Sequence, residues 1–158
     1  MSKNKIETAL DYLRNGQLII VADDDDREAE GDLVGIANLA TMESVNFMTK
    51  FARGLICAPI SAQLADRLQL TEMVAQNTDT FKTAFTISVD HRSTTTGISA
   101  EERARTIRAL ANPQTKEEDF QKPGHIFPLI GRIGGVLERR GHTEAALDLA
   151  CLLYTSPS

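Results

Sequence analysis

The sequence is poor in cysteine and aromatic residues and has no long apolar run. It contains two cysteines, Cys57 and Cys151, no tryptophan, and 5% aromatic residues. The two cysteines lack the short spacing of metal-ligand pairs, so neither a disulfide framework nor a zinc site is expected. No apolar segment approaches the roughly 20 residues of a membrane-spanning helix, and the polar start is unlike a secretory signal peptide. These absences favour a cytoplasmic protein with no membrane partner.

An excess of positive charge is also absent. The 17 Lys and Arg residues are outnumbered by 22 Asp and Glu, which gives a net charge of -5. Because nucleic acids and anionic membranes favour basic surfaces, neither is expected as the main partner. Local basic residues can still bind a small anion. A length of 158 residues with 42% hydrophobic content suits one globular domain.

Patterns typical of helices and strands alternate along the chain. Thr41, Ser61 and Ser99 are good N-cap residues, and Ser99 with Glu102 matches a capping box. We expect helices at 6–13, from 41 (with Val45, Met48 and Phe51 on one side), from 61, at 99–111 and from 143, a short turn with the capping pattern of Thr115 and Glu118, and strands at 18–21, 55–60, 83–89, 126–130 and 136–137. With no internal repeat or linker, the sequence predicts a single mixed α/β domain, and periodicity leaves open whether its sheet is parallel.

An acidic run at 23–32 follows the first predicted strand. Seven carboxylates share these ten positions with one arginine, Arg27. Two like charges 4 Å apart repel by about 1 kcal/mol in water and by about 4 kcal/mol at an effective dielectric of 20, so converging carboxylates need a compensating cation. Magnesium, manganese and calcium suit such oxygen ligands. Taken alone, the run is also typical of a solvated acidic loop.

A basic segment, 139–143, stands just before the last predicted helix. Arg139, Arg140 and Gly141 are followed by His142 and Thr143. Guanidinium groups, a hydroxyl and free N–H groups at a helix start make a chemically sensible phosphate site, and His142 can coordinate a metal. An ordinary basic helix entry is the alternative.

Three further features have both a functional and a structural interpretation. His125, held between Pro123-Gly124 and Pro128, can act as a general acid or base near neutral pH, or it can be a structural turn residue. The hydroxyl-rich loop at 94–99, which includes Thr96, can bind sugar hydroxyls or phosphate, or it can cap the following helix. Cys57, inside an apolar strand, fits a core position.

In combination and order these motifs resemble those of the 3,4-dihydroxy-2-butanone 4-phosphate synthases, over residues 6–150. The similar segments are 26–34 (DREAEGDLV), 53–57 (RGLIC), 77–79 (NTD), 83–90 (TAFTISVD), 95–100 (TTGISA), 105–110 (RTIRAL), 123–129 (PGHIFPL) and 134–145 (GGVLERRGHTEA). The resemblance implies an α+β fold with a mixed sheet flanked by helices, and a homodimer with active sites at the subunit interface. It also implies conversion of ribulose 5-phosphate to 3,4-dihydroxy-2-butanone 4-phosphate and formate in riboflavin biosynthesis, with Mg²⁺ or alternatively Mn²⁺.

The resemblance also assigns roles to individual residues. Glu28 and His142 would hold the metal, which polarises the substrate carbonyl and stabilises enediolate charge. Catalytic roles in proton transfer or pocket lining would fall to His125, Asp32, Glu30 and Cys57. Substrate and phosphate binding would involve Arg27, Glu28, Asp32, Thr96, Arg139, Arg140, Gly141, His142 and Thr143. Which carboxylate removes which proton stays open.

Two departures from the family pattern are present. Ala29 stands where the motif usually has asparagine, which we expect to change a loop hydrogen bond. After Ala150 the family continues into a strand with a catalytic glutamate, whereas this chain has 151–158 (CLLYTSPS). We therefore expect an incomplete synthase domain at 1–150, a non-native tail at 151–158, and exposed apolar surface. The alternative function is a non-catalytic metal- and sugar-phosphate-binding remnant. The sequence leaves open a fused GTP cyclohydrolase II domain in the parent protein.

Overall fold

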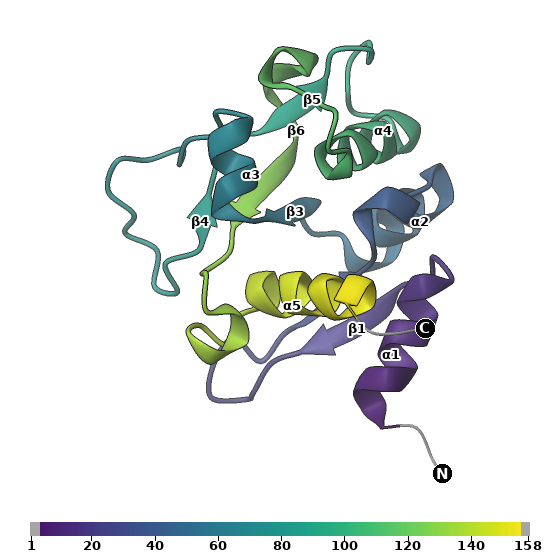
Figure 1. Ribbon diagram of the computed structural model, residues 1–158, viewed down its shortest axis with the longest axis vertical. Coiled ribbons are helices and arrows are strands. Elements are labelled where there is room, and N and C mark those ends of the chain that lie inside the picture. Colours follow the sequence, from purple (N-terminus) through teal and green to yellow (C-terminus); the bar gives the residue numbers. More distant parts are fainter. Residues whose placement is uncertain (1–3, 156–158) are drawn as a thin grey trace.

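The larger sheet is built around one long strand, β6 (Phe120–Ile130). In the computed structural model, which describes residues 4–155, β3 (Cys57–Ile60) pairs with β6 in parallel (Figure 1). Two short strands, β4 (Ala84–Phe85) and β5 (Val89–His91), pair with it antiparallel. The sheet is therefore mixed, and the predicted α+β class is confirmed.

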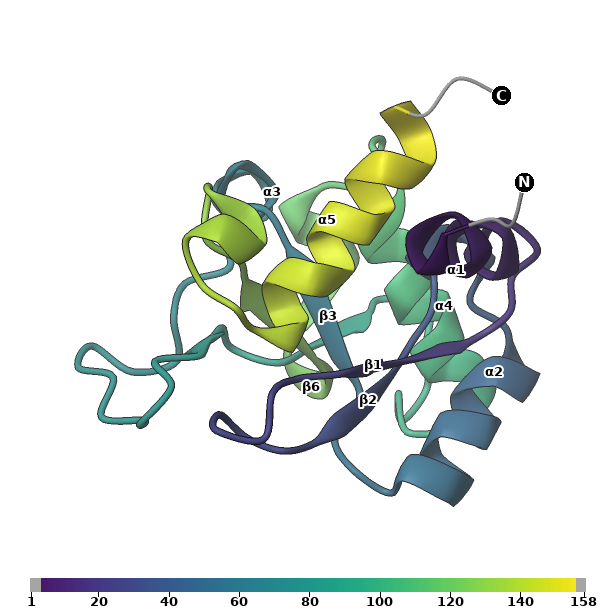
Figure 2. The same cartoon turned by 90° about the horizontal axis from the view of Figure 1, so that it is seen from below.

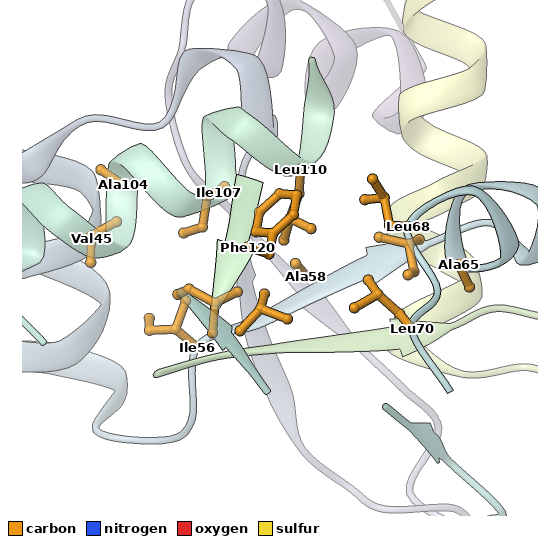
Figure 3. Packing of buried hydrophobic residues seen from close by; sticks show 13 residues of the cluster. Val45, Ile56, Ala58, Ala65, Leu68, Leu70, Ala104, Ile107, Leu110 and Phe120 are labelled. Atoms are coloured by element: carbon orange, nitrogen blue, oxygen red, sulfur yellow. The ribbon is translucent and has the colours of Figure 1, made fainter. Parts of the chain in front are cut away.

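Three helices cover one face of this sheet. They are α2 (Met42–Phe47), α3 (Ala62–Arg67) and α4 (Ala100–Ala111). Their apolar side chains meet those of β3 and β6 in the main core (Figure 3). Leu68 and Ile126 are fully buried there. Burying a side chain of this size contributes about 1.5–3 kcal/mol. Along β3 burial alternates, with Ala58 and Ile60 in this core, so Cys57 faces the other side.

A second, smaller layer lies on that other side. Strands β1 (Ile19–Ala22) and β2 (Gly31–Val34) form an antiparallel hairpin in which Ala22 pairs with Gly31. Helices α1 (Lys5–Arg14) and α5 (His142–Thr155) pack beside it through Leu10, Leu13 and Leu149 (Figure 2). The register leaves residues 23–30 as the hairpin loop. Both views place that loop near the start of α5.

The predicted helix starts at Thr41, Ser61 and Ser99 are confirmed. Each side-chain oxygen accepts a hydrogen bond from the backbone N–H three residues on, at 3.1–3.2 Å. Beyond α2 the chain continues as a π-helical segment, η2 (Met48–Ala52). Phe51 lies in this segment and is 61% exposed although Val45 is buried, so the predicted common apolar side does not include Phe51.

Two of the predicted strands differ from the structure. The strand expected at 83–89 is divided into β4 and β5, with a register shift between Val89 and Asp90. The strand expected at 136–137 is a 3-10 turn, η4 (Gly135–Leu137), because the Asp148 carboxylate accepts the Val136 N–H at 2.9 Å.

The short turn expected near 115 begins later, at η3 (Glu117–Asp119), because Asp119 rather than Glu118 accepts the Lys116 N–H, at 2.8 Å. A further 3-10 turn, η1 (Ala37–Leu39), precedes α2. Within residues 4–155, no helix is both long enough and apolar enough to cross a membrane.

Candidate active site

Asp23 organises the acidic hairpin loop from within. Its Oδ1 accepts the Glu30 N–H at 3.0 Å, and its Oδ2 accepts the Glu28 N–H at 3.2 Å and Nη1 of Arg27 at 2.7 Å. Burial opposes the ionisation of Asp23, but these hydrogen bonds hold the pKa of its carboxyl below the ordinary value. Asp23 therefore curls the loop back on itself and holds Glu28 and Arg27 on its inner side.

The loop contains one strained position. Ala29 has a φ of 54°, in the left-handed region that favours glycine and asparagine. Asparagine is the residue that the motif usually carries here. Replacing asparagine by Ala29 therefore affects the backbone conformation of the loop as well as its side-chain hydrogen bonds.

A cluster of three possible metal ligands joins the loop to α5. One ligand atom each from Asp23, Glu28 and His142 lies within 4.8 Å of the others. Nε2 of His142 is buried and has no hydrogen-bond partner, while Nδ1 lies 3.7 Å from Oδ2 of Asp32. A buried, unpartnered imidazole nitrogen beside two carboxylates fits a divalent cation, because an oriented neutral imidazole is a good metal ligand. The predicted pair Glu28 and His142 is thus together, and Asp23 is a third candidate.

An open cavity of about 370 Å³ lies between the acidic loop and the start of α5. Four predicted site residues line it, namely Arg27, Arg140, Gly141 and His142, together with Val21, Ala22, Asp23, Asp24, Asp26, Val136 and Ala145. Arg140 is largely exposed and lies 3.7 Å from the Asp24 carboxylate. The cavity thus has carboxylates on one side and a cation on the other, which suits a polar ligand with an anionic group.

Arg139 is held more firmly than the sequence suggested. Its Nη1 pairs with the fully buried Glu144 carboxylate at 2.6 Å, Nη2 donates to Oγ1 of Thr83 at 2.9 Å, and Nε donates to the Phe81 carbonyl at 3.1 Å. A Cβ on Gly141 would overlap Arg139 and Glu144, so only glycine fits there without a shift. Arg139 thereby fastens the 77–83 loop to the start of α5.

The same loop reaches Arg27. The Arg27 guanidinium lies 5.1 Å from the centre of the Phe81 ring and 2.7 Å from the Glu28 carboxylate. The 77–83 segment is thus clamped between the two arginines that flank the site. Thr143, predicted to bind phosphate, is buried in the first turn of α5.

Cys57 and Asp32 are electrostatically coupled. Burial, together with the negative charge of Asp32, raises the pKa of the Cys57 thiol to about 11. A pKa this far above neutral favours the protonated thiol. Cys57 is paired with Phe127, and His125, two residues before Phe127, lies on the same face of β6 as Phe127.

His125 and Thr96 make their contacts in a second group of residues. Nδ1 of His125 lies 2.7 Å from Oδ2 of Asp90, and Oγ1 of Thr96 lies 3.5 Å from Oε2 of Glu102. Sequence reasoning gave no role to Asp90 or Glu144, and it included Asp23 only as one member of the acidic run. Asp90 and Glu144 lie inside the family-like segments 83–90 and 134–145, and Asp23 lies in the acidic run, but only the fold shows which partners they contact.

An α+β domain with a carboxylate–histidine cluster beside a basic helix start defines a candidate metal- and anion-binding enzyme. The family model of 3,4-dihydroxy-2-butanone 4-phosphate synthase matches residues 7–158. The chain is 61% identical over 155 residues to a 3,4-dihydroxy-2-butanone 4-phosphate synthase of Oceanobacillus iheyensis, covering 98% of this chain and 75% of the relative. It is 58% identical to the riboflavin biosynthesis protein RibBA of Bacillus cytotoxicus, covering 98% of this chain and 39% of that longer protein.

Solved structures agree with these relatives. A 3,4-dihydroxy-2-butanone 4-phosphate synthase in complex with two magnesium ions superimposes with a TM-score of 0.93 at 43% identity, over 98% of this chain and 73% of that one. A two-domain synthase, RibBX from A. baumannii, gives a TM-score of 0.91 at 44% identity, over 96% of this chain and 45% of that one. The chain belongs to the 3,4-dihydroxy-2-butanone 4-phosphate synthase family.

Proposed function

We propose that this chain catalyses the conversion of ribulose 5-phosphate to 3,4-dihydroxy-2-butanone 4-phosphate and formate, a lyase reaction of riboflavin biosynthesis. The observation that carries the proposal is the cluster of Asp23, Glu28 and His142, with its unpartnered His142 nitrogen, in a chain so similar to a named synthase. A non-catalytic binding remnant is the less favoured alternative, since the relatives are named as synthases or riboflavin biosynthesis proteins.

Glu28 and His142 are the proposed metal ligands, with Asp23 close enough to join them. The magnesium ions in the similar structure favour Mg²⁺, with Mn²⁺ as a second candidate. A divalent cation at this place would polarise a substrate carbonyl and stabilise negative charge on its oxygens. Asp32, 3.7 Å from Nδ1 of His142, would orient the imidazole and is available for proton transfer.

The remaining roles follow from position. Arg140, exposed at the cavity rim, is the freest cation for the substrate phosphate, and Gly141 and Thr143 would offer backbone and hydroxyl groups at the start of α5. Arg139 would act while bound to Glu144, holding the rim in place. Arg27 and Glu30 would position the substrate, and the protonated Cys57 would line the pocket with His125 and Thr96.

Two further proposals concern assembly. The family resemblance favours a homodimer with sites at the subunit interface, acting in the cytoplasm. The longer RibBA and two-domain RibBX relatives show that a second domain is compatible with this fold, and GTP cyclohydrolase II is our candidate if the parent protein carries one. The assignment of residues 151–158 to a non-native tail stays a prediction; residues 151–155 continue α5.

The test is formate release from ribulose 5-phosphate by the full 158-residue chain, with Mg²⁺ and with a chelator. Because the family's catalytic glutamate is not among these residues, the same assay is run on the chain extended with the terminal segment of the family. In the extended chain we expect metal-dependent formate and a loss of more than about 100-fold in Glu28→Ala and His142→Ala, which exceeds the loss caused by changes to residues outside the metal's direct ligands. Glu118→Ala is the matched control and should keep full activity, because it removes an exposed carboxylate that is distant in sequence from Glu28 and His142.

Undiminished activity in both ligand variants would contradict the metal assignment. A folded chain that releases no formate, but whose unfolding midpoint rises with Mg²⁺, would support the binding-remnant alternative instead. At a Mg²⁺ concentration 100 times the Kd that stabilisation amounts to about 2.7 kcal/mol.

A further inference from the structure

Asp90 holds His125 with both oxygens of its carboxylate. Oδ1 accepts the His125 backbone N–H at 2.9 Å, and Oδ2 lies 2.7 Å from Nδ1 of the His125 ring. The Asp90 side chain is 7% exposed, whereas that of His125 is 42% exposed. One buried group therefore fixes the backbone and the ring of a histidine whose other side is open.

This arrangement selects one tautomer of the ring. An ionised carboxylate only accepts hydrogen bonds, so the contact at Nδ1 requires the proton to be on Nδ1. In the neutral ring, Nε2 is then the unprotonated nitrogen and is the atom able to take a proton. The exposed part of His125 is thus a proton acceptor with a fixed direction.

The fold closes tightly around the Asp90 carboxylate. Gly97 has a φ of 79°, and a Cβ at this position would overlap both carboxylate oxygens of Asp90. A Cβ on Gly124 would overlap the backbone of Val89 and Asp90. Two glycines thus allow the 95–97 loop and strand β6 to approach Asp90 from different sides. The next residue is also tied down, since the His91 N–H donates to Oγ1 of Thr106 at 2.9 Å.

The close approach of Gly97 links two parts of the predicted site. Thr96 precedes Gly97, so the hydroxyl loop rests against the carboxylate that orients His125. If Asp90 served only to accept the His125 backbone N–H, its second oxygen would not need to contact the His125 ring. The contact at Nδ1 is the feature that points to the chemistry of His125.

We propose that Asp90 is a positioning residue that holds the His125 ring in the Nδ1–H tautomer, with Nε2 presented as the proton acceptor of the reaction. The tautomer assignment stands on the Asp90–His125 geometry, and its catalytic consequence rests on the proposed function. Asp90 acts through His125 and does not itself touch the substrate.

The first measurement is the ring tautomer, by ¹⁵N NMR of the full chain labelled at histidine. In the unmodified protein we expect His125 in the Nδ1–H form. In Asp90→Asn the amide oxygen can still accept the backbone N–H while its NH₂ donates to Nδ1, so the ring should change to Nε2–H. Spectra of His125→Gln identify the signal among the three histidines.

The second measurement separates orientation from general damage. In Asp90→Asn we expect kcat for formate release to fall at least about 100-fold, the lower range for a general acid–base group, with KM changed less than about threefold. Because Asp90 acts through His125, Asp90→Asn should cost little further activity in the His125→Gln background.

Three results would overturn the proposal: an Nε2–H ring in the unmodified protein, an unchanged kcat in a folded Asp90→Asn variant, or full additivity of the two substitutions. If Asp90→Asn does not fold, the tautomer of the unmodified protein still decides the assignment. If no variant and no unmodified protein releases formate, the proposed function fails, while the tautomer measurement still tests Asp90.

Discussion

Two loops of this protein each fold around one carboxylate that accepts hydrogen bonds, but they differ in the polar atoms left without a partner. In the 94–99 loop, Glu102 accepts hydrogen bonds from the N–H and hydroxyl of Thr95, the Gly97 N–H and the hydroxyl of Ser99. In the acidic hairpin loop, Asp23 is similarly satisfied, but Nε2 of His142 is buried without a partner and Asp24 extends into solvent.

The difference shows which carboxylates are structural. Where donors within the chain surround a carboxylate, as they do at Glu102, they compensate its charge and the loop needs no further ligand. In the hairpin loop Arg27 pairs with both Asp23 and Glu28, so the buried Nε2 of His142 is the atom left without a partner and open to a group from outside the chain. An acidic residue is therefore interpreted from its hydrogen-bond partners, because charge alone does not separate a structural carboxylate such as Glu102 from a candidate metal ligand such as Glu28.

The largest expected effect on stability comes from breaking the buried ion pair between Arg139 and Glu144. Glu144→Ala removes the carboxylate that pairs with Arg139 at 2.6 Å and also accepts the Arg132 N–H at 3.1 Å. The Arg139 guanidinium would remain half-enclosed without its counter-charge, so we expect a loss of about 3–5 kcal/mol in the free energy of unfolding. Urea denaturation measures this loss.

Glu138→Ala is the matched control for that experiment. Glu138 is exposed and its carboxylate accepts the Gly134 N–H at 2.9 Å, so we expect a loss of at most about 1 kcal/mol. Equal effects of the two substitutions would contradict the view that the Arg139–Glu144 pair, rather than local hydrogen bonding, holds the rim of the site.

Much of the architecture follows from local sequence signals. The caps at Thr41, Ser61 and Ser99 and the apolar periodicity after them located three helices, because a cap and a helical face are properties of neighbouring residues. The strand at 136–137 was mispredicted because a distant carboxylate, that of Asp148, binds the Val136 N–H. Periodicity carries no record of such contacts.

The site was predictable to the same extent. The sequence motifs predicted that Glu28 and His142 lie close together, and they do. The motifs did not predict which partners hold these two residues. Asp23 is one of four consecutive aspartates, and only the hairpin register selects it as the one that turns inward. The contact of Arg139 with the Phe81 carbonyl joins segments far apart in the chain, and a backbone acceptor leaves no trace in residue type.

A smaller, pH-dependent effect on stability is expected from Glu102, which accepts the hydrogen bonds of the 94–99 loop. Hydrogen bonds to Glu102, foremost from the Thr95 N–H, lower the pKa of its carboxyl to about 2. Since this pKa is below the unfolded value of about 4.3, ionised Glu102 stabilises the fold above that pH, and the contribution is lost as the pH falls toward 2.

Glu102→Gln should therefore be less stable than the unmodified protein at pH 7, and the difference should shrink as the pH is lowered from about 4.5 to about 2. Urea midpoints at several pH values measure it, with the exposed Glu118→Gln as control. A difference that stays constant with pH would show that Glu102 contributes through shape and neutral hydrogen bonds alone.

The smallest expected effect concerns residue 29 of the acidic hairpin loop, and it is an increase in the free energy of unfolding. Ala29 lies in the left-handed region between Glu28 and Glu30, whose N–H groups both donate to Asp23. A residue other than glycine, asparagine or aspartate costs roughly 1–2 kcal/mol in that conformation. Ala29→Asn should therefore raise the free energy of unfolding by up to about 1 kcal/mol, measured by urea denaturation without added metal.

Ala29→Gly separates the two causes of that gain. Glycine removes the steric cost of the left-handed backbone but adds flexibility to the unfolded chain, which offsets about 0.5–1 kcal/mol. If both variants are more stable than the unmodified protein, the backbone conformation is the cause. If only Ala29→Asn is more stable, its side chain supplies a hydrogen bond that Ala29 lacks. If neither is, the loop carries no strain at residue 29, and its contrast with the 94–99 loop depends on the unpartnered nitrogen of His142 alone.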